Sequence, residues 1–435
     1  MLRFVYQLLL VAAWPWVQLR LRWRARREPE YGQRIAERFG RLPAEIPAGC
    51  VWFHTVSAGE TIAAAPLIAE LAALFPTQPI LVTTMTPTGS AQVRARLGER
   101  VHHCYAPYDF PWAVRRFYDR LQPRLLVLME TELWPNLIAA AAARDVPALL
   151  VNARLSARSA RGYRRVGSLT RSMLGSLQYI ACQYPDHAQR FIELGAPAER
   201  VLTHGSVKFD LRLPDDHAER VRALAARWGL HGPAWVAGST HPGEETAVLA
   251  AHRWLLQRQP DARLVLVPRH PARAPEVAAL CRDQGLSVAR QSAPGADDAS
   301  AQVIVGDTMG ELLYLYGLGD VAFVGGSFAD VGGHNPIEPA LCGKPVLMGP
   351  VVHNFADVVA AFRDAGCLQI VADAQQLGCA VARWMDDPAA RLALGLRARE
   401  VVAANGGATV RLRALLIETI DALAHGDFAQ ATRRD

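Results

Sequence analysis

Two glutamates in the first half of this 435-residue chain stand at or shortly after the ends of short apolar runs, where a carboxylate can do acid–base chemistry. Glu60 follows the run 51–56, and Glu130 follows the run 125–129. A carboxylate at the end of a buried strand can accept the proton of an attacking hydroxyl group. Glu60 also fits a capping role at a helix start, where the helix dipole favours the ionised carboxylate and is expected to lower its basicity. The sequence therefore predicts either a general base or a helix-capping acid at position 60.

The second half offers groups that bind anions. Arg269 follows the apolar run 264–267, where its guanidinium can bind a phosphate through two hydrogen bonds. Asn335 and Pro336 have the residue types of an N-cap and a first helical position, so a helix is predicted to begin there. The amides at such a helix start attract phosphate, and Glu338 in the first turn is placed to accept hydrogen bonds from ribose hydroxyls. A capped helix after a glycine-rich loop, with no ligand, is the structural alternative.

Two further features support a nucleotide site. Glycine turns at 306–310 and 325–326 follow apolar runs, and glycines let a phosphate or a base approach the backbone closely. The chain has only two lysines, Lys208 and Lys344, among 47 basic residues, which suggests that each meets a need for a compact ammonium group. Arginines between 154 and 165 are expected either to meet anionic substrate groups or to form a solvated basic face.

Other classes of site lack their patterns in this sequence. It has no G-x-G-x-x-G or G-x-x-x-x-G-K-[ST] motif, no D-x-D pair and no H-E-x-x-H motif, so neither a dinucleotide cofactor nor a metal is expected. Seven cysteines without a C-x-x-C pair favour reduced thiols over disulfides. The net charge of +6 is already reached within residues 1–41, which hold nine arginines and three glutamates. The basic charge is thus local, and no nucleic-acid partner is expected.

These residues must be positioned by strands, because unbroken apolar runs alternate with helical stretches along the chain. Such runs are typical of parallel strands that helices cover on both faces. Both halves begin with a strand, a glycine turn and a glutamate. We predict an α/β protein of two doubly wound domains with a ligand cleft between the carboxyl ends of their sheets. The expected strands are 51–56, 80–85, 125–129, 148–151 and 179–182, then 235–237, 264–267, 303–305, 321–324 and 345–348.

The N-terminus has the composition of a membrane anchor. Residues 4–19 are apolar apart from two glutamines, and tryptophans and five arginines follow within residues 14–27. Positive charge after the apolar run, rather than before it, argues against a cleaved signal peptide and places the remaining chain on the cytoplasmic side. Either a short membrane span or an interfacial helix fits, and a first helix packed on the body is the alternative.

Seven motifs together resemble the lipid A 3-deoxy-D-manno-octulosonic acid (Kdo) transferases. They occur in the family's order, at residues 54–60, 83–89, 129–136, 152–156, 205–210, 268–271 and 332–338. The resemblance implies a GT-B fold and an inverting transfer of Kdo from CMP-Kdo to the lipid A precursor at the cytoplasmic face of the inner membrane. It implies that Glu60 is the proton acceptor and that Glu130 and Lys208 stabilise the transition state. It further implies that CMP is bound by Pro268, Arg269, Met309, Gly310, Glu311, Asn335, Pro336, Ile337 and Glu338.

The expected organisation is an anchor (1–22), an acceptor-binding domain (23–213), a CMP-Kdo-binding domain (214–412) and a C-terminal helix (413–435). Two other functions share parts of this pattern. A GT-B nucleotide-sugar epimerase would have the same fold and nucleotide turns without a lipid anchor. A membrane-tethered nucleotide-sugar sensor would bind CMP without catalysis.

Overall fold

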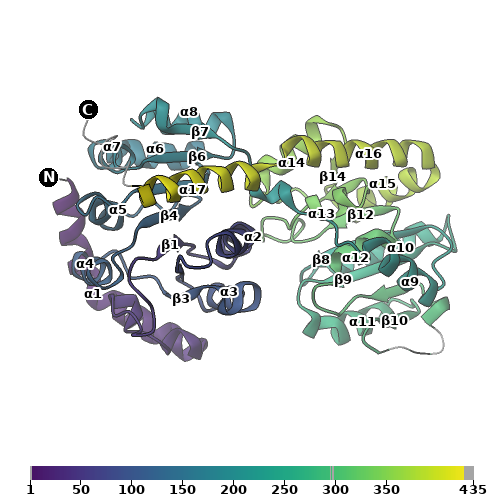
Figure 1. Cartoon of the computed structure of the whole chain (residues 1–435). Coiled ribbons are helices and arrows are strands. Elements are labelled where there is room, and N and C mark those ends of the chain that lie inside the picture. The colour runs from purple at the N-terminus through teal and green to yellow at the C-terminus, as the bar shows by residue number, and fades with distance from the viewer. Residues whose placement is uncertain (1, 294, 296–297, 426–435) are drawn as a thin grey trace. The chain divides into compact units, whose positions relative to one another are not determined.

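The computed structural model describes residues 2–293, 295 and 298–425, which form two compact units. Unit 1 comprises the chain up to Asp210 together with the segment from Gly406, and unit 2 comprises Leu211–Asn405 (Figure 1). The boundaries after 210 and 405 lie three and seven residues before the sequence-based boundaries after 213 and 412. The chain therefore leaves unit 1 once and returns to it at the end.

Unit 1 is built on a seven-stranded sheet in the order β3-β2-β1-β4-β5-β6-β7, in which every pair of neighbours is parallel. The sequential order reverses between β1 and β4, so the loops after these two strands diverge around the switch point of the sheet. The strands are β1 Val51–His54, β2 Ile80–Thr84, β3 His102–Tyr105, β4 Leu125–Met129, β5 Ala148–Ala153, β6 Tyr179–Cys182 and β7 Val201–Thr203.

Helices cover both faces of this sheet because alternate strand residues point to opposite sides. Phe53 packs into the core under α2 Ala58–Leu74, α3 Pro87–Leu97 and α17 Ala408–His425. Trp52 packs into the opposite core, under α4 Pro111–Leu121, α5 Pro135–Ala142, α6 Ala157–Arg165, α7 Gly167–Gly175 and α8 Pro185–Glu193. Burial on both faces explains why these strands are unbroken apolar runs.

Unit 2 repeats the plan with a parallel sheet in the order β10-β11-β9-β8-β12-β13-β14 and a switch point between β8 and β12. Its strands are β8 Ala234–Thr240, β9 Arg263–Pro268, β10 Val288–Arg290, β11 Val303–Val305, β12 Val321–Val324, β13 Val346–Met348 and β14 Leu368–Ile370. The helices α10 Glu244–Leu256, α11 Ala274–Asp283 and α15 Ala374–Asp386 share the core on one face.

The other face of the second sheet carries α12 Leu312–Leu318, whose Tyr316 lies over Gly238 so closely that a Cβ there would sit 2.2 Å from the phenol oxygen. Helices α9 His217–Arg227 and α13 Ile337–Leu341 contact α12, and α16 Pro388–Asn405 contacts α13 and α14 Ala356–Asp364. The prediction of two parallel-sheet α/β domains is confirmed by these two units.

All ten predicted strands are present, with ends that shift by up to three residues. The sequence did not predict the four strands at the sheet edges, which are β3, β7, β10 and β14. Edge strands are short and only partly covered, so they lack the apolar run that marks a central strand.

The N-terminal segment forms one long helix, α1 Leu2–Arg27, which belongs to unit 1. Among the described residues, α1 is the one helix whose length and hydropathy would allow it to cross a membrane. The expected apolar N-terminal helix is therefore present.

Candidate functional site

Glu60 lies in the first turn of α2, directly after the central strand β1. Ser57 is the N-cap, and its hydroxyl accepts a hydrogen bond from the Glu60 amide at 3.3 Å. In return, the Glu60 carboxylate accepts the Ser57 hydroxyl at 2.8 Å and the Val56 amide at 2.9 Å. This capping box fixes the carboxylate at the switch point of the sheet, and Glu60 is only 8 % exposed.

Glu130 and Glu132 follow β4, the neighbour of β1 across the switch point. The backbone of Glu130 is left-handed, with φ of +53°. Its carboxylate forms an ion pair with Arg154 at 2.7 Å, whereas the Glu132 carboxylate accepts the indole N–H of Trp134 at 2.8 Å. The loop after β4 therefore gathers two more carboxylates near Glu60.

These neighbours and the burial of the side chain raise the pKa of Glu60 to about 8. Burial is the largest cause, because it disfavours the charged form, and the charge of Glu132 is the next. The hydrogen bonds from Val56 and Ser57 act in the opposite direction but are outweighed. The expectation that the helix start makes Glu60 a weaker base is wrong for this reason. A carboxylate whose pKa lies near neutrality is better matched to proton transfer.

Lys208 lies in the 3-10 turn η5 Val207–Asp210, which contacts α2 and α17 within unit 1. The turn is held to the sheet because the Val207 amide donates to the side-chain oxygen of Asn152 at 3.3 Å. Glu60 and Glu130 interact electrostatically, and Arg154 is a basic partner of Glu130. Sequence reasoning treated Arg154 only as one of several arginines on a basic stretch.

In unit 2, the predicted CMP residues follow the strands β9, β11 and β12, which end at one edge of the parallel sheet. Pro268 ends β9 and is buried, while Arg269 is exposed and its amide donates to the Thr240 carbonyl at 2.9 Å. The positive charge of Arg269 favours the ionised form of Glu338, so these two residues lie close together. Burial nevertheless raises the pKa of Glu338 to about 6.

The turn 335–338 differs slightly from the prediction. Helix α13 begins at Ile337 with Pro336 as its N-cap, one residue later than expected, and Asn335 accepts the Ile337 amide at 3.1 Å. The Asn335 amide group also donates to Glu338 at 3.4 Å. Asn335 thus still satisfies the helix start, through an Asx turn rather than as N-cap.

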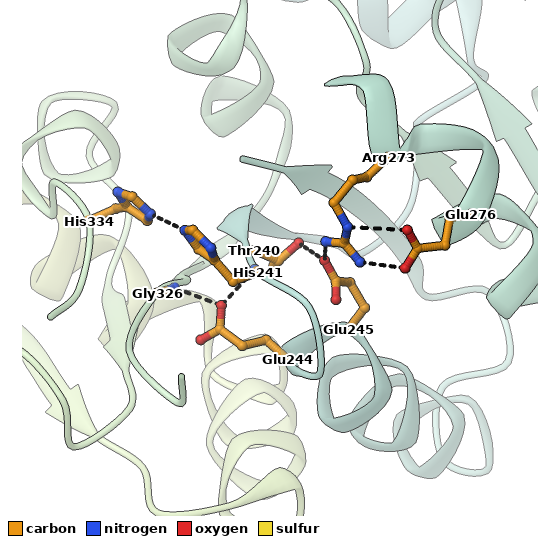
Figure 2. A network of polar contacts seen from close by, with 8 residues as sticks. All are labelled: Thr240, His241, Glu244, Glu245, Arg273, Glu276, Gly326 and His334. Carbon is orange, nitrogen blue, oxygen red and sulfur yellow. Dashed lines mark hydrogen bonds and ion pairs between the residues drawn. The ribbon is translucent and has the colours of Figure 1, made fainter. Parts of the chain in front are cut away.

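The glycine turn after β12 does not leave its amides available for a phosphate, contrary to the sequence interpretation. The buried carboxylate of Glu244, at the start of α10, accepts the Gly326 amide at 2.7 Å and the Ser327 amide at 2.9 Å (Figure 2 shows Glu244 and Gly326). It also accepts the amides of Phe328, Ala329 and His241. A protein carboxylate therefore occupies this anion-binding turn and ties α10 to β12 across the switch point.

Two histidines that the sequence analysis did not single out lie beside Arg269. The ring nitrogens of His241 and His334 are 2.8 Å apart, and the rings stack at an interplanar angle of 7° (Figure 2). Burial lowers the pKa of both, that of His334 to about 4 with a contribution from Arg269. The signal was available in the sequence, since His241 stands in the turn directly after β8.

The remaining CMP candidates lie after β11. Gly310 adopts φ of +81°, and Glu311 is the N-cap of α12. The Glu311 carboxylate already binds Arg220 and the side-chain amide of Gln291. Met309 is 73 % exposed, so its apolar side chain and the backbone around it are the accessible parts of this turn.

Comparisons with known proteins agree with this architecture. Residues 33–211 match the family model of 3-deoxy-D-manno-octulosonic-acid transferases (kdotransferase). The chain is 39 % identical over 420 residues to the 3-deoxy-D-manno-octulosonic acid transferase of Haemophilus influenzae, covering 96 % of this chain and 98 % of that one. The protein belongs to the Kdo transferase family. It is also 39 % identical to the Bordetella pertussis transferase, over 97 % of this chain and 98 % of that protein.

This Kdo transferase homologue is therefore a glycosyltransferase, and the resemblance predicted from its motifs is confirmed. Solved structures at low identity support its GT-B fold. A glycosyltransferase from Rickettsia africae has a TM-score of 0.56 at 11 % identity, over 86 % of this chain and 99 % of that one. A UDP-GlcNAc 2-epimerase from Neisseria meningitidis has a TM-score of 0.55 at 14 % identity, over 85 % and 99 % of the two chains. These similarities define the fold and not the reaction.

Proposed function

We propose that this protein transfers Kdo from CMP-Kdo to the lipid A precursor with inversion at the anomeric carbon. Two facts support the proposal: membership of the Kdo transferase family and a buried carboxylate, Glu60, whose pKa is raised to about 8 at the switch point of unit 1. The position of the buried Glu60 carboxylate at the switch point, fixed by Ser57 and Val56, is the single structural observation that carries the base role.

In this reaction Glu60 takes the proton from an acceptor hydroxyl as its oxygen attacks the anomeric carbon of Kdo. The bond between that carbon and the phosphate oxygen of CMP breaks, and its electron pair leaves with CMP. Each Glu60 carboxylate oxygen already accepts one hydrogen bond, from Ser57 or Val56, which holds the group in one orientation. A fixed base of this kind needs little reorganisation in the transition state.

Glu130 and Lys208 are proposed to stabilise the transition state. The ion pair with Arg154 orients the Glu130 carboxylate, which can then balance positive charge that develops on the sugar. Lys208 would supply an ammonium group to an anionic group of the donor or of the departing CMP. Neither group needs a metal for this role, and no cofactor is proposed.

Unit 2 is proposed to bind the CMP part of the donor. Arg269 is exposed at the edge of the sheet, where a guanidinium can bind a phosphate, and Glu338 beside it can accept ribose hydroxyls. Backbone groups of Pro268, Met309, Gly310 and Glu311 would contact the base and ribose, with Asn335, Pro336 and Ile337 shaping the turn that presents Glu338.

The lipid acceptor requires a protein at a membrane. The proposed location is the cytoplasmic face of the inner membrane, where α1 provides apolar surface and its last turns provide Arg24, Arg26 and Arg27 for anionic lipid. Positive charge after the apolar run favours a cytoplasmic position for the chain that follows it.

The decisive experiment measures CMP release from CMP-Kdo with and without lipid A precursor. We expect stoichiometric CMP and a Kdo-lipid product of inverted configuration only when the lipid is present. Glu60→Gln should still bind CMP but transfer no Kdo, and the exposed Glu99→Gln should transfer normally.

The same experiment separates the alternatives. Conversion of the nucleotide sugar without lipid would indicate an epimerase, and CMP binding without turnover on any lipid A precursor would indicate a sensor. Transfer by a well-folded Glu60→Gln variant would exclude Glu60 as the base.

A further inference from the structure

Helix α1 lies along unit 1 rather than projecting from it. Its side chains facing the body recur at helical spacing: Tyr6, Leu10, Val17 and Leu21. Leu10 and Val17 pack on the aromatic cluster that includes Phe110, and Leu21 is buried. The contact therefore extends along most of the helix, as Figure 1 shows for α1 beside α4.

Polar contacts fix the N-terminal end of α1 to the same body. The Tyr6 hydroxyl donates to Asp109 at 2.9 Å, and the Gln7 amide group donates to Asn136 at 2.7 Å. Asp109 also accepts the amides of Asn136 and Leu137 at the start of α5. A helix held at both ends against a folded body cannot at the same time be surrounded by hydrocarbon.

The exposed side chains of α1 are apolar from Phe4 to Leu19, and exposed arginines flank Trp23 in the last turns. Leu9 is 64 % exposed and Leu19 67 %, values that are unusual for leucines in a globular protein. This outer face consists of Phe4, Val5, Leu8, Leu9, Val11, Trp14, Trp16, Leu19 and Trp23. Arg20 and Arg27 stack on Trp16 and Trp23, a combination typical of helices that lie in the headgroup region.

A basic hollow of about 920 Å³ adjoins this face, bounded by α1, α4 and α5. Among the described residues that line it, Asp119 is the one carboxylate, and it is already paired with Arg144 at 2.6 Å. Apolar atoms of Val11 and Trp112 complete the wall. The arginines lining it are Arg3, Arg115, Arg116, Arg120 and Arg144. Five cations and one anion, beside apolar side chains, match a phosphate attached to acyl chains.

The hollow is separate from the residues assigned to the transfer reaction. Helices α4 and α5 cover one face of the first sheet, and α2, which carries Glu60, covers the other. The lining runs from Pro111 and Asn136, in the first turns of α4 and α5, to Arg120 and Arg144, at or beyond the carboxyl-terminal ends of these helices. Glu60, Glu130 and Lys208 are not among the residues that line the hollow.

We propose that the outer face of α1 lies in the plane of the cytoplasmic leaflet, without crossing it, and that the hollow binds the phosphate headgroup of an anionic phospholipid. The inference rests on the membrane location in the proposed function, but not on the transfer chemistry. Unit 1 would then bind one leaflet only, and the outer face of α1 together with the adjacent hollow would fix its orientation on the bilayer.

A labelling experiment tests the orientation of α1. A cysteine on a short glycine linker is added before the N-terminal methionine of full-length protein in which the exposed Cys379 is Ser, and spheroplasts receive a membrane-impermeant maleimide. An in-plane helix predicts labelling only after permeabilisation. Labelling in intact spheroplasts would mean that α1 spans the membrane and would overturn the proposal.

A vesicle experiment tests the hollow. Purified Arg115→Gln/Arg116→Gln protein is compared with the control Arg222→Gln/Arg253→Gln, which removes two exposed charges from unit 2. Binding is measured on vesicles with and without about 30 mol % phosphatidylglycerol, which gives the vesicle surface a negative charge. We expect the first pair to reduce partitioning to anionic vesicles roughly 30-fold and the second to change it less than about threefold.

Equal losses in both variants would show that binding follows net charge and would overturn the phosphate site. Kdo transfer to acceptor in detergent micelles is measured in parallel, because it depends on the reaction chemistry and not on bilayer binding. Loss of vesicle binding with normal transfer in micelles supports the inference. Loss of transfer in micelles would instead indicate a failure of the proposed function, so the two failures can be told apart.

Discussion

The raised pKa of Glu60 predicts a pH-dependent stability that a single substitution should remove. Burial and the nearby charge of Glu132 raise this pKa from 4.5 to about 8 in the folded protein. In the unfolded chain the carboxyl group keeps its ordinary value, so between these limits folding requires Glu60 to take up a proton. Glu60→Gln mimics the protonated form and eliminates this linkage.

The sign follows directly from the higher pKa in the folded state. Wild type and Glu60→Gln should be similarly stable near pH 4.5, and the free energy of unfolding of wild type should fall relative to that of Glu60→Gln as the pH rises through about 8. At about 1.4 kcal/mol per pH unit, the upper limit of the difference is about 5 kcal/mol, reached above pH 8. Between roughly pH 5.5 and 8.5 the difference should grow by about 3 kcal/mol.

Urea denaturation at a series of pH values, followed by tryptophan fluorescence, measures the free energy of unfolding of both proteins. Trp52 is buried in unit 1 on β1, the strand that precedes Glu60, so the signal includes the unfolding of unit 1. Four tryptophans in unit 2 contribute as well, so the transition of unit 1 is identified as the one that Glu60→Gln shifts. Glu99→Gln, at an exposed site, is the matched control and should follow wild type at every pH. A constant difference between Glu60→Gln and wild type would refute the reasoning, because it would mean that the folded protein does not perturb the pKa of Glu60.

Three further substitutions test the sites separately. Glu132→Gln removes a charge that raises the pKa of Glu60, so the acid limb of kcat/KM for Kdo transfer should move to lower pH by about half a unit or more, while Glu99→Gln leaves it in place. Glu244→Gln leaves backbone amides facing a side-chain amide in a buried site, so the free energy of unfolding measured in urea should fall by about 1.5–3 kcal/mol. The control Glu276→Gln removes an exposed ion pair with Arg273 and should lower the free energy of unfolding by less than about 1 kcal/mol. Arg269→Ala should weaken CMP binding about tenfold or more in calorimetry without changing the melting temperature, whereas Arg222→Ala should leave the affinity unchanged; equal affinities would remove Arg269 from the phosphate site.

The central strands of both sheets could be predicted from sequence because burial on two faces leaves an unbroken apolar run. Strand β4, Leu125–Met129, was predicted to the residue. The edge strand β3 reads His-His-Cys-Tyr and is only half covered, so no hydrophobic pattern distinguishes it from a loop. Its place in the sheet is set by hydrogen bonds to β2, which a local reading of the sequence does not contain.

The positions of the site residues along the chain could be predicted from sequence, but the surroundings of their side chains in the folded protein could not. Glu60 and Glu130 could be placed at strand ends because each follows an apolar run. The pKa of Glu60 depends on a carboxylate 72 positions away, at residue 132, and on the depth of the surrounding core, neither of which is a local pattern. Likewise, the amides of Gly326 and Ser327 could be interpreted as a phosphate site only because nothing near them in the sequence indicates that Glu244 fills it.

The return of the chain to unit 1 through α17 has a consequence for biosynthesis. This helix buries Leu412 and Leu416 in the core beneath α2, its first amides bind Asp210, and Arg413 pairs with Glu70 at 2.8 Å. On the ribosome, the first seven strands therefore wait with an uncovered apolar surface until the last helix emerges, whereas Leu211–Asn405 is contiguous and can fold at once. A chain that is truncated before residue 406 and released from the ribosome should consequently recruit chaperones through unit 1, even though unit 2 is complete and can fold.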